Sequence, residues 1–350
     1  MTTYFITGLT GFLGNNLLLE LEKTDNYRII AFVFPDEIDL ECLKKPYIKC
    51  VTGNLLNKED IKKFLSENVN GDKIVIHIAG RVSTFRRHDD LTMQINFEGT
   101  KNIVDVMNEL GDFKKLIYIS SVDAMPRNTT KNEIYEVGYY DIKKVDGVYG
   151  KSKALANNYI LDNLKTDSSI ILPSAIIGPY DPRTSPLNNA IKKFLNNKLP
   201  AVTKGGYNLV DSRDVAKGIL LATEHGINKE SYLITGNYIS VEDLICLAAR
   251  LTNKKPIKRK VPHLLIKIIS PFIEIHSRLH RKIPLFNGFS MDCLKQNSNY
   301  SYKKAHNDFG YEPRPLEESI KDTISWMNDV YAEDPGKWEK AAADWESYGA

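Results

Sequence analysis

Continuous apolar segments alternate with mixed polar and apolar segments along the first half of the chain. Unbroken apolar runs are typical of parallel strands buried on both faces, and the mixed segments between them predict covering helices. Strands are expected at residues 4–6, 28–34, 48–51, 74–78, 115–119, 169–172 and 232–234, and helices at 57–68, 95–110, 148–164, 187–196 and 316–330. The alternation predicts an α/β fold with a doubly wound parallel sheet, in which ligands bind beyond the carboxyl ends of the strands.

A glycine-rich turn joins the first expected strand to the helical segment that follows it. Gly8, Gly11 and Gly14 have the spacing Gly-x-x-Gly-x-x-Gly. In such a turn the first glycine permits the tight bend, the second lets backbone approach a pyrophosphate, and the third lets the helix pack closely. The helix N-terminus also offers N–H groups to an anion. The strand, turn and helix in this order predict dinucleotide binding, with an ordinary βα turn as the alternative.

A tyrosine and a lysine stand four residues apart at the start of the 148–164 helix. Tyr149 and Lys153 therefore share one face of that helix. An ammonium beside a phenol lowers the pKa of the phenol, which makes it a usable general acid/base near neutral pH. Ser121 follows the 115–119 strand and is placed to hold a carbonyl oxygen. The same Tyr-x-x-x-Lys spacing recurs at Tyr139–Lys143, Tyr140–Lys144 and Tyr300–Lys304, in a polar loop or outside the sheet pattern.

Composition describes a soluble globular enzyme rather than a nucleic-acid-binding or membrane-spanning protein. The 350 residues are 42% apolar and 26% charged, and the net charge of +3 is too small to indicate a nucleic-acid partner. None of the four cysteines lies in Cys-x-x-Cys spacing, so no metal site is expected. The first strand starts near the N-terminus and no apolar run reaches the length of a membrane span. A cytoplasmic location is expected, and a homodimer is compatible with the sequence.

Together these motifs resemble the extended short-chain dehydrogenases/reductases, in particular the dihydroflavonol reductase and 3β-hydroxysteroid dehydrogenase branch. The matching segments are 7–14, 96–100, 120–121, 149–153, 173–179, 210–216 and 304–313. The resemblance implies an NAD(P)-binding Rossmann domain over 1–175, with later contributions from about 209–236. It also implies a smaller C-terminal substrate-binding lobe over 176–330, followed by a tail over 331–350.

The same resemblance implies a role for each matching residue. Tyr149 would donate and accept the proton, Lys153 would bind the nicotinamide ribose and lower the pKa of Tyr149, and Ser121 would hydrogen-bond the substrate oxygen. Asn96 is expected either to act directly or to tie a helix to a strand. The residues expected to bind the cofactor are Gly8, Thr10, Gly11, Phe12, Leu13, Gly14, Phe34, Asn54, Leu55, Ala79, Gly80, Arg81, Ile119, Tyr149, Lys153, Pro173 and Ile176.

Departures from the family pattern bear on the choice between NAD and NADP. Phe34 stands where NADP-preferring relatives often carry an arginine, and Asp36 and Glu37 nearby would repel a 2′-phosphate. Val33 is nevertheless not the aspartate of many NAD-preferring relatives, and Asn54 replaces a usual aspartate beside the adenine. These positions favour NAD and leave NADP open.

The expected substrate is a hydrophobic ring alcohol or ketone, steroid-like or flavonoid-like. The stretch 263–275 is unusually apolar and contains Pro271, which should kink a helix there. It is read as a packing helix, as a wall for an apolar substrate, or, with the lysines and arginines before it, as peripheral membrane contact through 254–279. Phe85, Phe286 and Phe289 are further candidates for an apolar wall.

Two other functions stay open at this point. A nucleotide-sugar epimerase or dehydratase shares the catalytic tyrosine and lysine, and the basic residues Arg183, Lys192, Lys193 and Arg213 would suit its diphosphate. A non-catalytic NAD(P)-binding regulatory protein is the alternative of a different class, against which the intact Ser121, Tyr149 and Lys153 set argues.

Overall fold

The computed structural model describes residues 1–83, 86, 89–126, 132–262, 265, 268, 270 and 288–333. Pro271, Phe85, Phe286 and most of the apolar stretch 263–275 lie outside these residues, as do residues 334–350. None of the helices within the described ranges combines the length and apolar character needed to cross a membrane.

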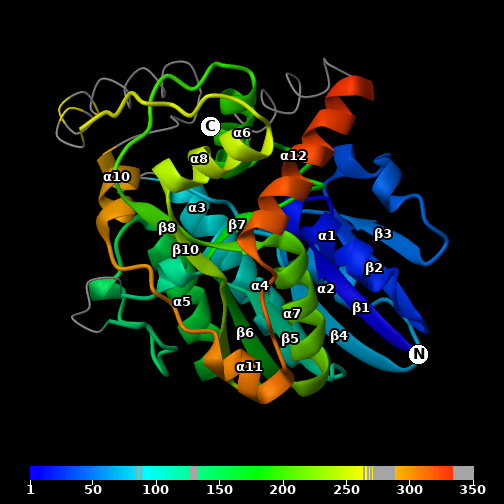
Figure 1. Cartoon of the computed structure of the whole chain (residues 1–350). Coiled ribbons are helices and arrows are strands. Elements are labelled where there is room, and N and C mark those ends of the chain that lie inside the picture. The colour runs from blue at the N-terminus through cyan, green and yellow to red at the C-terminus, as the bar shows by residue number, and fades with distance from the viewer. Residues whose placement is uncertain are drawn as a thin grey trace.

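A seven-stranded sheet forms the centre of the molecule (Figure 1). Its order is β3-β2-β1-β4-β5-β6-β9, and every neighbouring pair is parallel. The strands are β1 (Thr2–Thr7), β2 (Tyr27–Val33), β3 (Ile48–Thr52), β4 (Asp72–His77), β5 (Lys115–Ile119), β6 (Asp167–Pro173) and β9 (Glu230–Ile234). This confirms the predicted doubly wound sheet. Strand order reverses between β1 and β4, which is where such sheets bind their ligands.

Helices cover both faces of this sheet. The pleat sends the neighbours Phe5 and Ile6 of β1 to opposite sides, into two separate buried clusters. Ile6 packs in one cluster with Leu17 and Ile219, and Phe5 packs in the other with Phe64. The first face carries α1 (Phe12–Leu21), α7 (Ser212–His225) and α11 (Lys303–Phe309), and the second carries α2 (Lys58–Leu65), α4 (Gly99–Leu110) and α5 (Val148–Asn163). Figure 1 shows α1 and α7 side by side.

A smaller sheet and its own helices make up much of the second half. Strand β8 (Gly206–Asp211) pairs parallel with β7 (Ala175–Ile177) and antiparallel with β10 (Asn237–Ser240). Helices α6 (Pro186–Leu195), α8 (Val241–Leu251) and α12 (Leu316–Glu333) share a third buried cluster with it and gather at the top of Figure 1. The division into two domains at residue 175 stays a prediction.

Strands β7, β8 and β10 are not among those expected from the sequence. The segment 210–216 spans the junction of two elements, because Val210 and Asp211 complete β8 and Ser212 begins α7. The Asp211 side chain caps α7 by accepting a hydrogen bond from the Arg213 N–H.

Candidate active site

The glycine turn leaves the carboxyl end of β1 in a conformation that requires glycine. Gly8 has a φ of 77°, and the Gly11 N–H donates to the Gly8 carbonyl oxygen at 3.2 Å. A Cβ at Gly14 would lie 2.2 Å from the same oxygen, so a side chain there would push α1 away. In this fully described turn, α1 has no side-chain cap and no acidic residue in its first turn. Its first N–H groups therefore fit the pyrophosphate of a dinucleotide.

A buried histidine network ties together the elements beneath this turn. His77 Nδ1 lies 2.6 Å from Thr7 Oγ1, and His77 Nε2 lies 3.0 Å from Thr100 Oγ1. The Ala79 N–H donates to Thr7 Oγ1 at 3.2 Å. Burial lowers the pKa of His77 to about 3, so the ring is neutral at physiological pH. Sequence reasoning missed this group, although a histidine inside the apolar run 74–78 was the signal for it.

Lys153 lies deep under the end of β5 and beside the loop that follows β4. Its ammonium donates to the Ile119 carbonyl oxygen at 2.7 Å and stands 4.8 Å from the centre of the Tyr118 ring. A Cβ at Gly80 would lie 3.1 Å from Lys153 Nζ, so these two candidate residues are neighbours. Burial lowers the pKa of the Lys153 ammonium to about 7.

Tyr149 and Ser121 face each other from the start of α5 and the end of β5. Burial raises the pKa of the Tyr149 phenol, and its hydrogen bond with the Ser121 side chain lowers it in part. This direction differs from the expectation that Lys153 would bring the Tyr149 pKa down. The reason is that surrounding protein desolvates the phenol of the half-buried Tyr149, while the Lys153 ammonium is directed at the Ile119 carbonyl. The phenol is thus protonated at neutral pH.

Asn96 ties the loop after β4 to α5. Its side-chain oxygen accepts from the Arg81 N–H at 2.7 Å, and its amide nitrogen donates to the Arg81 carbonyl and to Ser152 Oγ, both at 2.9 Å. It sits in a π-helical turn, Gln94–Glu98, between α3 (Asp90–Met93) and α4, where one continuous helix is predicted. Such turns often occur at functional sites because they redirect a side chain. All polar atoms of Asn96 bind protein, as expected of a tie between segments.

The other cofactor candidates lie on the same edge of the sheet, since the strands before them are parallel. Phe34 follows β2 and is 44% exposed. Asn54 follows β3 and is exposed, and its side-chain oxygen accepts from the Leu56 N–H at 2.9 Å within its own turn. Leu55 is buried. Pro173 ends β6 and Ile176 lies in β7. Thr10, Phe12 and Leu13 belong to the glycine turn and the first turn of α1.

The competing Tyr-x-x-x-Lys pairs lie in different surroundings. Tyr139 is 65% exposed in its loop. Tyr140 is fully buried, against the expectation of a polar loop position, because its hydroxyl pairs with Ser231 Oγ at 2.7 Å and its ring packs into the core. Tyr300 is buried far along the chain and pairs in an isolated bridge with Ile134. Tyr149 alone of these four stands beside Ser121.

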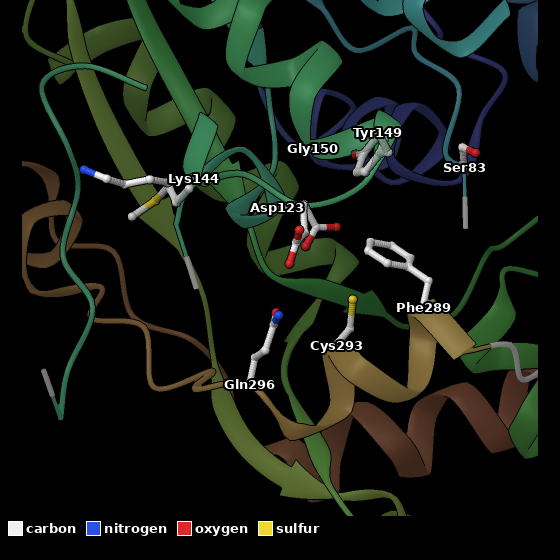
Figure 2. A pocket seen from close by; sticks show the side chains of 10 residues that line it. Ser83, Asp123, Lys144, Tyr149, Gly150, Phe289, Cys293 and Gln296 are labelled. Carbon is white, nitrogen blue, oxygen red and sulfur yellow. The ribbon is translucent and has the colours of Figure 1, made fainter. Parts of the chain in front are cut away.

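A hollow that is partly open to solvent lies beside Tyr149, which is one of its lining residues (Figure 2). Figure 2 shows Phe289, Cys293 and Gln296 rising from α10 (Gly288–Lys295) and the segment after it toward Tyr149 and Asp123. The lining residues are Ser83, Asp123, Met125, Lys144, Asp146, Tyr149, Gly150, Phe289, Cys293 and Gln296.

This lining mixes apolar and polar side chains. Phe289, a predicted wall residue, packs against the start of α5, where a Cβ at Gly147 would lie 2.5 Å from its ring. Gly147 has a φ of 77°, so glycine is required there on both grounds. Asp123, Lys144 and Asp146 add charge that the sequence did not predict for this wall. The lining is thus partly apolar and partly charged.

Comparison with known proteins places the chain among enzymes of related chemistry. It is 26% identical over 333 residues to a Synechocystis sp. protein described provisionally as a dihydroflavonol 4-reductase, covering 93% of this chain and 94% of that protein. It is 27% identical over 347 residues to the decarboxylating sterol-4-alpha-carboxylate 3-dehydrogenase of Mus musculus, covering 91% and 89%.

Solved structures share the whole fold. The crystal structure of gox2253 has a TM-score of 0.78 and 27% identity, and covers 94% of this chain and 98% of that one. UDP-glucose 4-epimerase of Thermotoga maritima, solved with UDP-glucose, has a TM-score of 0.71 at 19% identity, covering 94% and 99%. At that identity the epimerase is similar in fold alone.

The family comparison agrees with the geometry of the site. The model of the 3-beta hydroxysteroid dehydrogenase/isomerase family matches residues 5–245, which include the glycine turn, Ser121, Tyr149 and Lys153. The match spans most of the chain, and the two relatives are covered over 94% and 89% of their own length. The chain therefore belongs to the 3-beta hydroxysteroid dehydrogenase/isomerase family, of the extended short-chain dehydrogenase/reductase type, and is an NAD(P)-dependent oxidoreductase.

Proposed function

We propose that the protein interconverts a secondary alcohol and a ketone on a hydrophobic ring substrate, steroid-like or flavonoid-like, with Tyr149 as the general acid/base. The observation that carries this proposal is the Tyr149 phenol, which lines the hollow and forms a hydrogen bond with the Ser121 side chain. The names of the relatives, which refer to sterol and dihydroflavonol chemistry, support the substrate class.

Each residue of the set has a distinct task in this proposal. The protonated Tyr149 phenol donates its proton to the substrate oxygen in the direction of reduction and takes it back in oxidation. Ser121 holds the same oxygen by a hydrogen bond, which fixes the reacting carbon. Lys153 contacts the Ile119 carbonyl and stands beside Gly80, where it is placed to hydrogen-bond a ribose. A nicotinamide bound at the glycine turn would supply or accept the hydride.

A nucleotide-sugar epimerase or dehydratase is the weaker alternative. It needs basic side chains for a diphosphate, and two of the candidates are engaged elsewhere. Arg213 binds the carboxylates of Asp211 and Asp322, and Arg183 binds Glu37. The carboxylates of Asp123 and Asp146 in the hollow would moreover repel a diphosphate.

A substrate screen tests the proposal. The purified protein is mixed with NAD or NADP and, separately, a 3β-hydroxysteroid, a bile acid, a flavan-diol and a UDP-sugar, and nicotinamide absorbance is followed. Ketosteroid and dihydroflavonol are tested with the reduced cofactors. We expect turnover in the steroid or flavonoid arms. Because epimerisation leaves the nicotinamide spectrum unchanged, UDP-sugar products are separated by chromatography; conversion of the UDP-sugar alone would overturn the proposal.

A further inference from the structure

A buried carboxylate occupies the space between the glycine turn and the end of β2. Glu37 is only 7% exposed, at the end of a short 3₁₀ turn, Pro35–Glu37. Its Oε1 accepts from the Thr10 hydroxyl at 2.9 Å, and its Oε2 accepts from the Phe34 N–H at 3.2 Å. The turn thus folds the carboxylate back against the glycine motif, although Glu37 lies beyond the end of the strand.

This position is where the adenosine ribose of a dinucleotide belongs. In Rossmann folds the pyrophosphate sits at the N-terminus of the first helix, and an acid about 20 residues farther along binds the ribose 2′-hydroxyl. Neither Val33 nor Phe34 supplies such an acid. Glu37 is an acid close to this place, and the hydrogen bond that it accepts from Thr10 ties it to the glycine turn.

A cation from the other half of the chain reaches the same carboxylate. Arg183, on the segment after β7, forms an ion pair with Glu37 Oε1. That segment is fixed in place, since the Asn16 side chain of α1 donates to the Pro179 carbonyl at 3.2 Å and the Arg183 N–H donates to Asp181 at 3.3 Å. The sequence, which offered no cation near Phe34, therefore missed the one that the fold brings there.

We propose that Glu37 and Arg183 together select NAD over NADP. Glu37 accepts hydrogen bonds from the ribose hydroxyls and at the same time neutralises Arg183, the cation that a 2′-phosphate would need. The proposal rests on the cofactor site of the proposed function and not on its substrate. It makes a residue from outside the nucleotide-binding half a determinant of cofactor choice.

Glu37 should weaken the binding of a 2′-phosphate and Arg183 should strengthen it, so substitutions of the two residues should have opposite effects on NADPH binding. Removing the charge of Glu37 abolishes its repulsion of the phosphate and its ion pair with Arg183, whose guanidinium can then bind phosphate oxygens in a planar, bidentate way. Removing Arg183 leaves the Glu37 carboxylate in place and uncompensated, held by Thr10 and the Phe34 N–H. The gain in NADPH binding from the first change must therefore depend on the presence of Arg183.

Binding titrations of NADH and NADPH test this without any substrate. Dissociation constants are measured by nicotinamide fluorescence for the parent protein, Glu37→Gln, Arg183→Gln and the double variant. We expect Glu37→Gln to tighten NADPH by about tenfold or more and to weaken NADH several-fold, as the loss of a charge-assisted hydrogen bond predicts. Arg183→Gln should weaken NADPH relative to NADH, and the double variant should lose the NADPH gain.

Asp39→Asn is the matched control, because it removes the same charge from an exposed residue close to Glu37 in the sequence. Its ratio of NADH to NADPH affinity should stay within about twofold of the parent ratio, since an exposed charge is screened. An equal shift in Asp39→Asn and Glu37→Gln, or an NADPH gain that survives in the double variant, would overturn the proposal. Should Glu37→Gln not fold, an unchanged ratio in Arg183→Gln overturns it instead.

A failure of the cofactor titrations can be told apart from a failure of the proposed function. A parent protein that oxidises ring alcohols while Glu37→Gln leaves both affinities unchanged contradicts only the selection by Glu37 and Arg183. A parent protein that binds neither NADH nor NADPH contradicts both.

Discussion

In the candidate site, burial lowers the pKa of the Lys153 ammonium. Its ammonium donates to a carbonyl oxygen, and burial lowers its pKa from 10.5 to about 7. Between these two pH values the unfolded chain keeps a proton that the folded protein has released. Unfolding then takes up a proton, so folding is favoured as the pH rises. The free-energy cost of burying the charged Lys153 side chain therefore has its full size below pH 7 and disappears toward pH 10.5.

Replacing Lys153 by methionine should make this cost visible. Lys153→Met removes the titrating group, so the variant should gain stability relative to the parent below pH 7 and lose that advantage as the pH rises. The difference in the free energy of unfolding should change by up to about 1.4 kcal/mol per pH unit between pH 7 and pH 9. Urea unfolding of both proteins without added cofactor measures it, and a difference independent of pH would contradict the low pKa.

Residue by residue, the sequence predicted the parts of the site that lie on short motifs. Tyr149 and Lys153 share one helix turn, and Ser121 follows a recognisable strand, so local spacing was enough to find them. The partners Glu37 and Arg183 are 146 residues apart. No local pattern links two such residues, because their contact depends on how the segment after β7 packs against α1.

At the scale of elements, a charge network fastens α12 to α7. The Arg213 guanidinium donates to both carboxylate oxygens of Asp211, at 2.9 and 2.7 Å, and to Asp322 of α12 at 2.7 Å. Arg314 adds a hydrogen bond to Asp214 at 2.9 Å. The Asp211 side chain has no exposed surface, whereas that of Asp322 is 38% exposed. The two ion pairs of Arg213 should therefore contribute very differently to stability.

Two substitutions separate these contributions. Arg213→Met leaves the buried Asp211 carboxylate without its main partner and should lower the free energy of unfolding by about 3 kcal/mol. Asp322→Ala removes only the exposed partner and should cost less than about 1 kcal/mol. Urea unfolding at neutral pH gives both values. Equal costs would contradict the larger contribution of the buried pair between Arg213 and Asp211.

The elements of the main sheet were predictable, and those of the small sheet were not. Apolar runs mark β4, β5 and β6 because both faces of these strands are buried. The strands β7 and β10 span only 175–177 and 237–240, and each is separated in sequence from its partner β8. Such short segments show no recognisable alternation of apolar and polar residues. The π-turn before α4 escaped prediction because Asn96, and not apolar periodicity, holds it.

At the scale of the whole molecule, the candidate site needs both halves of the chain. The parallel sheet supplies the glycine turn, Ser121, Tyr149 and Lys153 at its carboxyl edge. The second half adds Phe289 from α10 to the wall of the hollow and Arg183 to the proposed nucleotide site. In the function that we propose, cofactor and substrate meet where the two halves pack together, and Tyr149 moves the proton there.

The most direct test compares Tyr149→Phe with Tyr139→Phe on a ring alcohol that the parent protein oxidises. Both changes remove one phenol hydroxyl, but Tyr139 is exposed in a loop away from Ser121. With nicotinamide absorbance as the readout, Tyr149→Phe should lower kcat by about 10²- to 10⁴-fold while NADH still binds, and Tyr139→Phe should leave kcat within about twofold. Undiminished turnover in Tyr149→Phe would contradict the account.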